Sequence, residues 1–159
     1  MSTLANLRAM TTAADLVRRR MRLSIVSSLT GVSQRTLRTL WKETHGEGAP
    51  NGKLPESVLS FITTPKAAAD VAAFINLHLQ QWGSFKTIDP EHLLHTVDTG
   101  ARIGQEINVN AAYYALRDLR AGFISFPKCS GCGAKFVFDV SAGRNADRCP
   151  FCAQMPHKD

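Results

Sequence analysis

The sequence has no long hydrophobic run. Its longest apolar stretches, such as residues 71–75 and 136–138, are far shorter than the roughly 18 apolar residues that a membrane-spanning helix needs. The N-terminus likewise has no continuous apolar segment followed by a small-residue cleavage site, so no export signal is recognised. We therefore expect a cytoplasmic protein that has no membrane partner.

The sequence also lacks the motifs that carry catalysis. It has no Gly-rich phosphate loop, no Gly-x-Ser-x-Gly elbow and no Ser/His/Asp arrangement, and Asp98 and Glu106 are isolated acids. His78, His92 and His95 have no acidic or Cys ligands at matching spacing, so we interpret them as ordinary polar or half-buried histidines. The sequence predicts neither an enzyme nor a small-molecule substrate.

Acidic residues are scarce in the first third of the chain. Residues 1–53 contain nine Lys or Arg against three Asp or Glu, a net charge of +6 that equals the charge of the whole chain of 159 residues. Residues 54–108 carry −3 and residues 109–159 carry +3. Clustered Arg favours a phosphate-rich partner, because each neutralised phosphate releases counterions, although a solvated helix face has the same composition.

Residues 12–44 have the pattern of a helix-turn-helix. A first helix is predicted over residues 12–22, and it can continue to Leu29. Gly31 then favours the left-handed turn that ends a helix, and Ser33 offers an N-cap to a second helix over residues 34–44. A helix, a Gly turn and a second helix also occur in all-α domains that do not bind DNA.

The second predicted helix has one apolar face and one polar, basic face. Leu37, Leu40 and Trp41 are spaced three and four residues apart on the apolar face. A recognition helix fits the major groove, where Arg and Gln contact base edges, so we predict base contacts by residues of the polar face. These are Gln34, Arg35, Arg38 and Thr39, and the other predicted DNA-binding residues are Arg18, Arg19, Arg20, Arg22, Ser33, Thr36 and Lys42.

Residues 54–122 are predicted to be a helical region for packing and partner interaction. Pro65 and Pro90 each follow a capping residue, which is the order that starts a helix. Asn110 can cap a third helix that ends at Gly122.

All four cysteines lie in the last 31 residues, as two CxxC pairs with sixteen residues between them. They are Cys129, Cys132, Cys149 and Cys152. Two such turns bring four thiolates to one tetrahedral site that suits zinc. Because a closed four-thiolate shell has no open position for water, we expect one structural zinc ion per chain.

Residues 135–140 alternate like a strand between the two pairs, which predicts a zinc ribbon. Three alternatives to a zinc site exist. Two disulfides are disfavoured in a cytoplasmic protein, and a redox CxxC motif would not need a second CxxC. An iron–sulfur cluster is the remaining alternative. The predicted fold is therefore mainly α with a small C-terminal β zinc ribbon. Its three regions are an N-terminal helix-turn-helix region over residues 1–53, a helical middle over residues 54–122 and the zinc ribbon over residues 123–159.

The order of these parts resembles the FlhC family, the larger-chain partner in the bacterial flagellar master transcription activator. The resemblance covers roughly Thr12 to Cys152, and the cysteines and the order of modules carry most of it. Its other specific pieces are Arg22-Leu-Ser, Gly31-Val-Ser-Gln-Arg-Thr-Leu, Leu40-Trp-Lys-Glu, Gly52-Lys-Leu-Pro and Leu116-Arg-Asp-Leu-Arg-Ala-Gly.

The resemblance implies a transcription activator subunit that joins a small FlhD-like subunit in a hetero-oligomer, binds double-stranded promoter DNA and helps recruit RNA polymerase. The chain ends seven residues after Cys152, without the basic extension of flagellar members. FlhC-like activators of conjugative plasmids and mobile elements switch on transfer genes, and the short end inclines our expectation toward them. The alternative function is a zinc-stapled protein-interaction or assembly factor; an accessory module of a nucleic-acid-processing enzyme ranks last because no active site is found.

Overall fold

Helices make up most of the computed structural model, which describes residues 2–139 and 146–153. The predicted mainly α fold is confirmed, since this part of the chain contains six α-helices, one 3-10 helix and no strand. The elements are α1 (Thr3–Arg18), α2 (Leu23–Thr30), α3 (Gln34–His45), η1 (Val58–Phe61), α4 (Pro65–Trp82), α5 (Pro90–Arg102) and α6 (Val109–Ala121). Among them, no helix is both long and apolar enough to cross a membrane.

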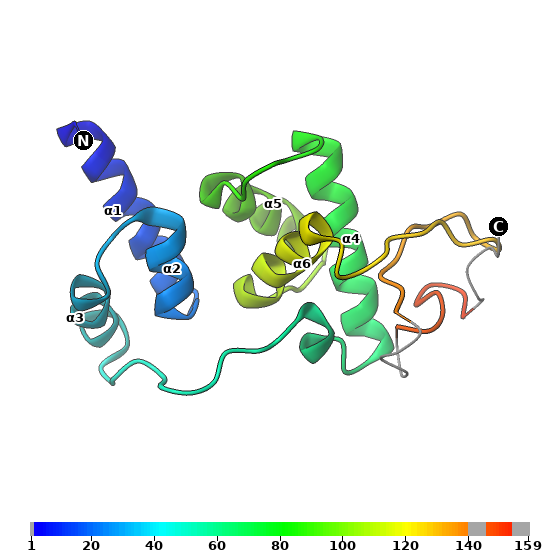
Figure 1. The fold of residues 1–159 in the computed structure, drawn as a ribbon, viewed down its shortest axis with the longest axis horizontal. Coiled ribbons are helices and arrows are strands. Elements are labelled where there is room, and N and C mark those ends of the chain that lie inside the picture. Colours follow the sequence, from blue (N-terminus) through cyan, green and yellow to red (C-terminus); the bar gives the residue numbers. More distant parts are fainter. Residues whose placement is uncertain (1, 140–145, 154–159) are drawn as a thin grey trace.

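The helices form two neighbouring groups. Figure 1 shows α1, α2 and α3 together at one end of the molecule, α4, α5 and α6 in the middle, and the C-terminal segment at the other end. Pro65 and Pro90 begin α4 and α5, as predicted, and the side chains of Thr64 and Asp89 cap these two helices. Local sequence signals therefore placed the starts of both central helices correctly.

The turn between α2 and α3 is also as predicted. Gly31 has the left-handed φ of 76° and ends α2. The Ser33 side chain accepts the Thr36 N–H at 3.3 Å and so caps the start of α3. The polar face of α3 therefore begins directly after a tight turn.

The prediction of one helix continuing from residue 12 to Leu29 is wrong. Arg20 has a left-handed φ of 65°, and α1 ends at Arg18 while a new helix starts at Leu23. A non-glycine residue in this conformation costs about 1–2 kcal/mol, so contacts elsewhere must hold the break.

Asn110 supplies those contacts instead of capping α6. Its Oδ1 accepts the Arg22 N–H at 3.0 Å, and its Nδ2 donates to the Arg20 carbonyl at 3.1 Å. The cap of α6 is Asn108, whose side chain accepts the N–H groups of Asn110 and Ala111. The break between α1 and α2 is thus hydrogen-bonded to the first turn of α6.

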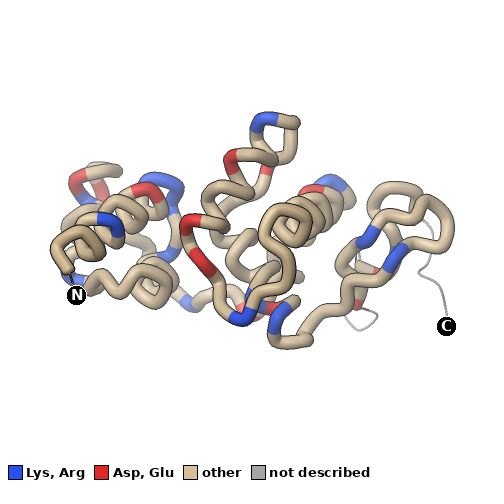
Figure 2. The backbone as a smooth tube through the Cα atoms, turned by 90° about the horizontal axis from the view of Figure 1, so that it is seen from above, with Lys and Arg blue, Asp and Glu red and all other residues tan. Residues whose placement is uncertain are grey.

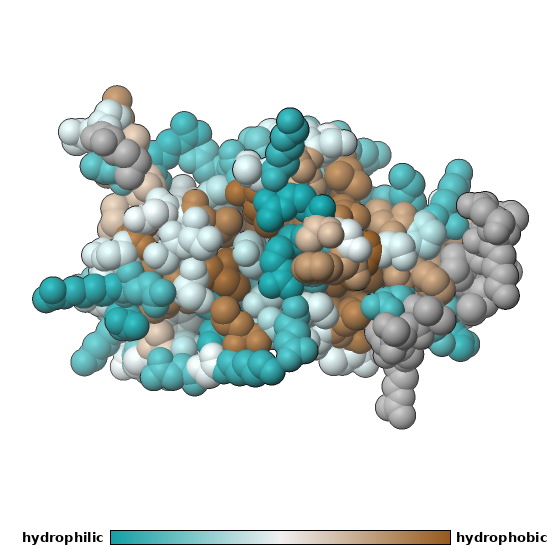
Figure 3. Space-filling view, in the orientation of Figure 1, coloured by the Kyte–Doolittle hydropathy of each residue, from teal (hydrophilic) through white to brown (hydrophobic). Residues whose placement is uncertain are grey.

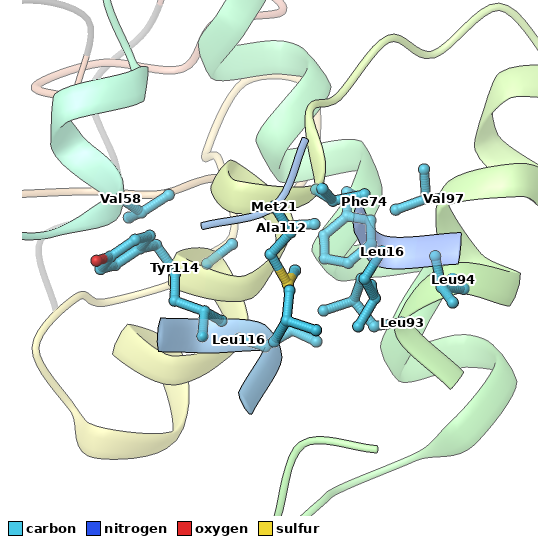
Figure 4. Close-up of a cluster of buried hydrophobic side chains, with 14 of the residues drawn as sticks. Leu16, Met21, Val58, Phe74, Leu93, Leu94, Val97, Ala112, Tyr114 and Leu116 are labelled. Carbon is cyan, nitrogen blue, oxygen red and sulfur yellow. The ribbon is translucent and has the colours of Figure 1, made fainter. Parts of the chain in front are cut away.

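One hydrophobic core joins the two groups of helices. Leu16 and Met21 are fully buried, and Figure 4 shows them among Phe74, Leu93 and Leu116 from the middle of the molecule. Full burial of a side chain of this size contributes about 1.5–3 kcal/mol. The N-terminal helices are therefore held against α5 and α6 by apolar packing.

Two ion pairs also connect the N-terminal helix α1 and its C-terminal end with α5. Arg19 donates to the two carboxylate oxygens of Asp98 at 2.7 and 3.1 Å, and the Arg8 guanidinium pairs with Glu91. Hydrogen bonding to Asp98 raises the pKa of Arg19. These two ion pairs connect α1 and the residue that follows it with α5.

The three histidines of the middle region lie around Trp82 or Thr96. His78 Nδ1 is 2.8 Å from the Thr96 hydroxyl, and burial lowers the pKa of His78 to about 4. His92 stacks on the Trp82 ring at a centroid distance of 3.7 Å, and His95 meets the ring edge at 5.5 Å. Packing and hydrogen bonding therefore account for all three.

A buried carboxylate anchors η1 to α6. Asp118 is fully buried, accepts the Val58 N–H at 2.7 Å and forms an ion pair with Arg117 at 2.8 Å. Arg117 also donates to the Glu56 carbonyl at 2.7 Å and lies 4.4 Å from the centroid of the Tyr114 ring. The chain segment that connects α3 with η1 is therefore held to α6 at Glu56 and Val58.

We expect Asp118→Ala to lower the free energy of unfolding by about 3 kcal/mol, because it leaves the Arg117 guanidinium and the Val58 N–H without their buried acceptor. Urea unfolding followed by circular dichroism measures the change. Glu56→Ala removes an exposed carboxylate from the same segment, and we expect it to change stability by less than about 0.5 kcal/mol. An Asp118→Ala protein as stable as this control would contradict the anchoring role.

Candidate metal centre and nucleic-acid surface

The four cysteine sulfur atoms gather at one point. Each Sγ of Cys129, Cys132, Cys149 and Cys152 lies within 4.8 Å of the other three. The Cys129–Cys152 and Cys132–Cys149 sulfur distances are 3.4 and 3.6 Å. Tetrahedral zinc with Zn–S bonds of about 2.3 Å separates its sulfur ligands by about 3.8 Å, whereas disulfide sulfurs are about 2.05 Å apart. The cluster fits a single metal ion, and its chemistry is compatible with zinc.

The two CxxC turns have the same local geometry. In the first turn, the Gly131 N–H donates to Cys129 Sγ at 3.3 Å. In the second turn, the Phe151 N–H donates to Cys149 Sγ at 3.4 Å. Gly133 and Ala153, each four residues after the first cysteine, close the turns by donating to its carbonyl at 3.0 and 2.8 Å. Both have left-handed φ values, of 78° and 63°. Backbone hydrogen bonds therefore orient the sulfurs in both turns.

Two of the four thiols have pKa values that are shifted in opposite directions. Backbone hydrogen bonds from Cys132 and Gly131 lower the pKa of Cys129 to about 6. Burial raises the pKa of Cys149. Because the thiolate is the form that binds metal, the backbone hydrogen bonds at Cys129 favour its metal-binding form.

The segment around the first CxxC turn is less regular than predicted. Instead of a strand over residues 135–140, residues 135–139 contain only bridge positions, and residues 140–145 lie outside the described part. Two isolated antiparallel bridges, Ser125–Phe138 and Lys128–Lys135, join the two sides of the turn. Among the described residues these bridges do not extend into a regular strand, so they give this small unit little support of its own.

A small second core seats the metal centre on α4. Phe136 is fully buried and packs in a cluster with Ala72 of α4, Cys129 and Cys149. The Asn76 side chain of α4 donates to the Lys135 carbonyl at 3.3 Å. The metal centre is therefore attached to the middle helices by the packing of Phe136 and by this hydrogen bond, and the neighbouring Ile124 and Val137 are buried in the main hydrophobic core.

The polar face of α3 lies entirely at the surface. Leu37 and Trp41 are buried on the opposite side, as predicted. Arg35, Arg38 and Lys42 are exposed, and none of them forms an ion pair with another described residue. Figure 3 shows long hydrophilic side chains projecting from the N-terminal end of the molecule. The other exposed residues of this face are Ser33, Gln34, Thr36, Thr39 and Glu43.

The basic cluster at the end of α1 is largely bound to the chain's own acids. The Arg19 side chain is only 22% exposed and contacts both Asp15 and Asp98. Burial acts to raise the pKa of Asp15, but hydrogen bonds from Arg18 and Arg19 bring it below its usual value. The spacing of Asp15 and Arg19, four residues apart on one helix, was the available sequence signal for this pairing.

Arg20 and Arg22 also have partners within the molecule. Arg20 pairs with Glu47 at 3.1 Å and lies 5.9 Å from the centroid of the Trp41 ring. Arg22 donates to the Gly52 carbonyl at 2.7 Å. Both contacts hold the segment after α3 close to the break between α1 and α2.

Comparison with known proteins finds one family across nearly the whole chain. The model of the family described as flagellar transcriptional activator (FlhC) matches residues 1–158. A flagellar transcriptional regulator FlhC of Enterobacter cloacae subsp. cloacae is 26% identical over 139 residues, covering 83% of this chain and 72% of that protein. One of Cupriavidus metallidurans is 28% identical over 150 residues, covering 91% of this chain and 70% of that protein.

We expect Cys132→Ser to abolish stoichiometric zinc binding and to unfold the C-terminal segment, since metal binding supplies folding energy to a unit too small for its own core. Elemental analysis gives the zinc content, and hydrogen exchange gives the protection of residues 124–139. The amide groups of α5 in the same sample are the internal control and should keep their protection. Full zinc content in the variant would rule out a four-cysteine site.

Proposed function

The chain belongs to the FlhC family of flagellar transcriptional activators, whose members regulate transcription, and from that premise we propose how this member binds DNA. We infer that α2 and α3 act as a helix-turn-helix and that α3 enters the major groove of promoter DNA. The metal centre is a structural zinc ribbon, and the chain works in a hetero-oligomer with a FlhD-like subunit that recruits RNA polymerase.

The exposed basic face of α3 is the observation that carries this proposal. Arg35 and Arg38 have no acidic partner among the described residues, while Leu37 and Trp41 hold the helix from behind. A guanidinium group makes bidentate hydrogen bonds to guanine in the major groove. We assign base contacts to Gln34, Arg35, Arg38 and Thr39, and backbone contacts to Ser33, Thr36 and Lys42.

The basic cluster at the end of α1 divides into two roles. The side chains of Arg18 and Arg20 are 67% and 58% exposed, so they can exchange their surface ion pairs for DNA phosphates. Arg19 and Arg22 are bound within the molecule, where they position the N-terminal helices. Their contribution to DNA binding is therefore through the placement of α3.

The need for a partner follows from the size of the proposed DNA contact. Single DNA-binding modules bury about 600–1,000 Å² of protein surface, whereas specific complexes bury about 1,000–2,500 Å². The chain also exposes apolar side chains on the first turns of α1, where Leu4 and Leu7 are 78% and 63% exposed. Such a stripe on a projecting helix suits a helical partner subunit.

We expect this chain alone to bind a promoter duplex weakly and in a salt-sensitive manner, and to bind it tightly together with the FlhD-like subunit, because the hetero-oligomer presents more than one DNA contact. Gel-shift titration of both preparations against the upstream regions of flagellar operons and of conjugative-transfer operons measures this. A scrambled duplex is the control. Equal affinity with and without the partner would refute the hetero-oligomer, and a salt slope near zero would favour an assembly factor.

We expect Arg35→Ala or Arg38→Ala to relax sequence preference, at a cost of about 1–3 kcal/mol on the specific duplex if the contact is bidentate to guanine. Competition between the promoter and the scrambled duplex measures specificity. Arg102→Ala removes an exposed arginine of α5 and should leave both affinities unchanged. If the α3 variants weaken both duplexes equally, these side chains contact phosphates and not bases.

A further inference from the structure

Two lysines face each other beside the metal centre. Lys128 and Lys135 form one of the two antiparallel bridges, and both side chains are exposed. Like charges directly opposite on an antiparallel pair repel each other. Neither lysine forms an ion pair with any other described residue. Within residues 2–139 and 146–153, the fold therefore holds two positive charges side by side without a carboxylate partner.

The backbone beneath the two lysines is firmly held. Cys129 donates its N–H to the Ala134 carbonyl at 2.7 Å, and Asn76 of α4 donates to the Lys135 carbonyl at 3.3 Å. The buried Phe136 follows directly in the sequence. The positions from which both lysine stems start are thus fixed relative to α4.

An open cleft adjoins Lys128. It has a volume of about 700 Å³ and is lined by residues 127–133, which include the first CxxC turn. The side chain of Lys128 passes close to Gly133, since a Cβ built there would lie 3.5 Å from Lys128 Cε. An ammonium group at the edge of an open, glycine-containing turn is accessible to a phosphate group of a large ligand.

We propose that Lys128 and Lys135 form a second DNA contact that binds backbone phosphates of the promoter duplex. This inference rests on the proposed function, in which α3 makes the first contact. The two contacts lie at opposite ends of the long axis of the molecule, and Figure 2 shows basic segments close together at the C-terminal end. In this proposal, a duplex that follows the long axis contacts α3 at one end and the lysine pair at the other.

A different role for the lysines makes a different experimental prediction. Four thiolates around one divalent ion leave a net negative charge, which nearby ammonium groups would offset. In that role the lysines stabilise the metal site, and their removal speeds zinc loss without changing the salt dependence of DNA binding. A DNA contact instead changes the salt dependence and leaves zinc in place.

The test uses Lys128→Gln/Lys135→Gln in the zinc-loaded complex with the FlhD-like subunit. The control is Lys53→Gln/Lys66→Gln, which removes the same charge from two exposed lysines elsewhere. We expect the slope of log affinity against log salt to become shallower by about 1.8 for the first variant, since each lost phosphate contact contributes about 0.9. The promoter and scrambled duplexes should weaken equally, and the control should keep the slope of the unsubstituted protein. The variant Lys128→Arg/Lys135→Arg retains both positive charges and should also keep the slope of the unsubstituted protein.

Three results would overturn the proposal while leaving the function of α3 intact. The first is a Gln variant whose slope equals that of the control. The second is faster zinc transfer from this variant to a chelator, which assigns the lysines to the metal charge. The third is weaker capture of the FlhD-like subunit, which assigns them to a protein contact. Failure of the unsubstituted complex to bind any duplex would instead overturn the proposed function.

Discussion

The burial of the break between α1 and α2 against α6 is the constraint on which the arrangement of the N-terminal helices depends. Met21 enters the common core there, and Asn110 holds the backbone on either side of it with two hydrogen bonds. The left-handed conformation of Arg20 costs free energy in this turn, and the burial of apolar surface offsets that cost. Helices α2 and α3 follow this break directly. The contacts of Met21 and Asn110 therefore set the direction in which α3 presents its basic face.

Several arginines stabilise the fold through ion pairs and hydrogen bonds, which the net charge of the sequence does not show. The guanidinium of Arg19 satisfies two acids, one of them on α5, and Arg117 connects a buried carboxylate with a backbone carbonyl and an aromatic ring. A planar guanidinium with several donors suits such multiple contacts better than an ammonium group does. Arg35 and Arg38 have no acid partner among the described residues, so their positive charge is available to an external polyanion without the loss of an ion pair.

Several local signals in the sequence predicted the structure correctly, although Asn110 does not cap α6 and residues 135–139 form no regular strand. Gly31, Ser33 and the two helix-starting prolines act through their own backbone or the next turn, and the spacing within each CxxC turn depends on four residues. The ion pair between Arg19 and Asp98 and the clamp of Asn110 join residues about 80 to 90 positions apart. No pattern within a short window specifies such contacts. The same limit explains why a continuous helix was expected across Arg20, whose local sequence suits a helix well.

The position of the metal centre gives it an influence beyond its own segment. The segment is too short to fold around a core of its own, so the geometry of its loops depends on the four sulfurs and on apolar side chains, such as Phe136, that pack against the rest of the molecule. Any metal that closes the four-thiolate shell also fixes the backbone between the first two cysteines and the Lys128–Lys135 bridge. Loss of the metal would therefore release the two lysines from their fixed positions without removing their charge. A rigid pair loses less conformational entropy on binding phosphates than two lysines on a disordered chain, so the metal and the charge act together at this end of the molecule.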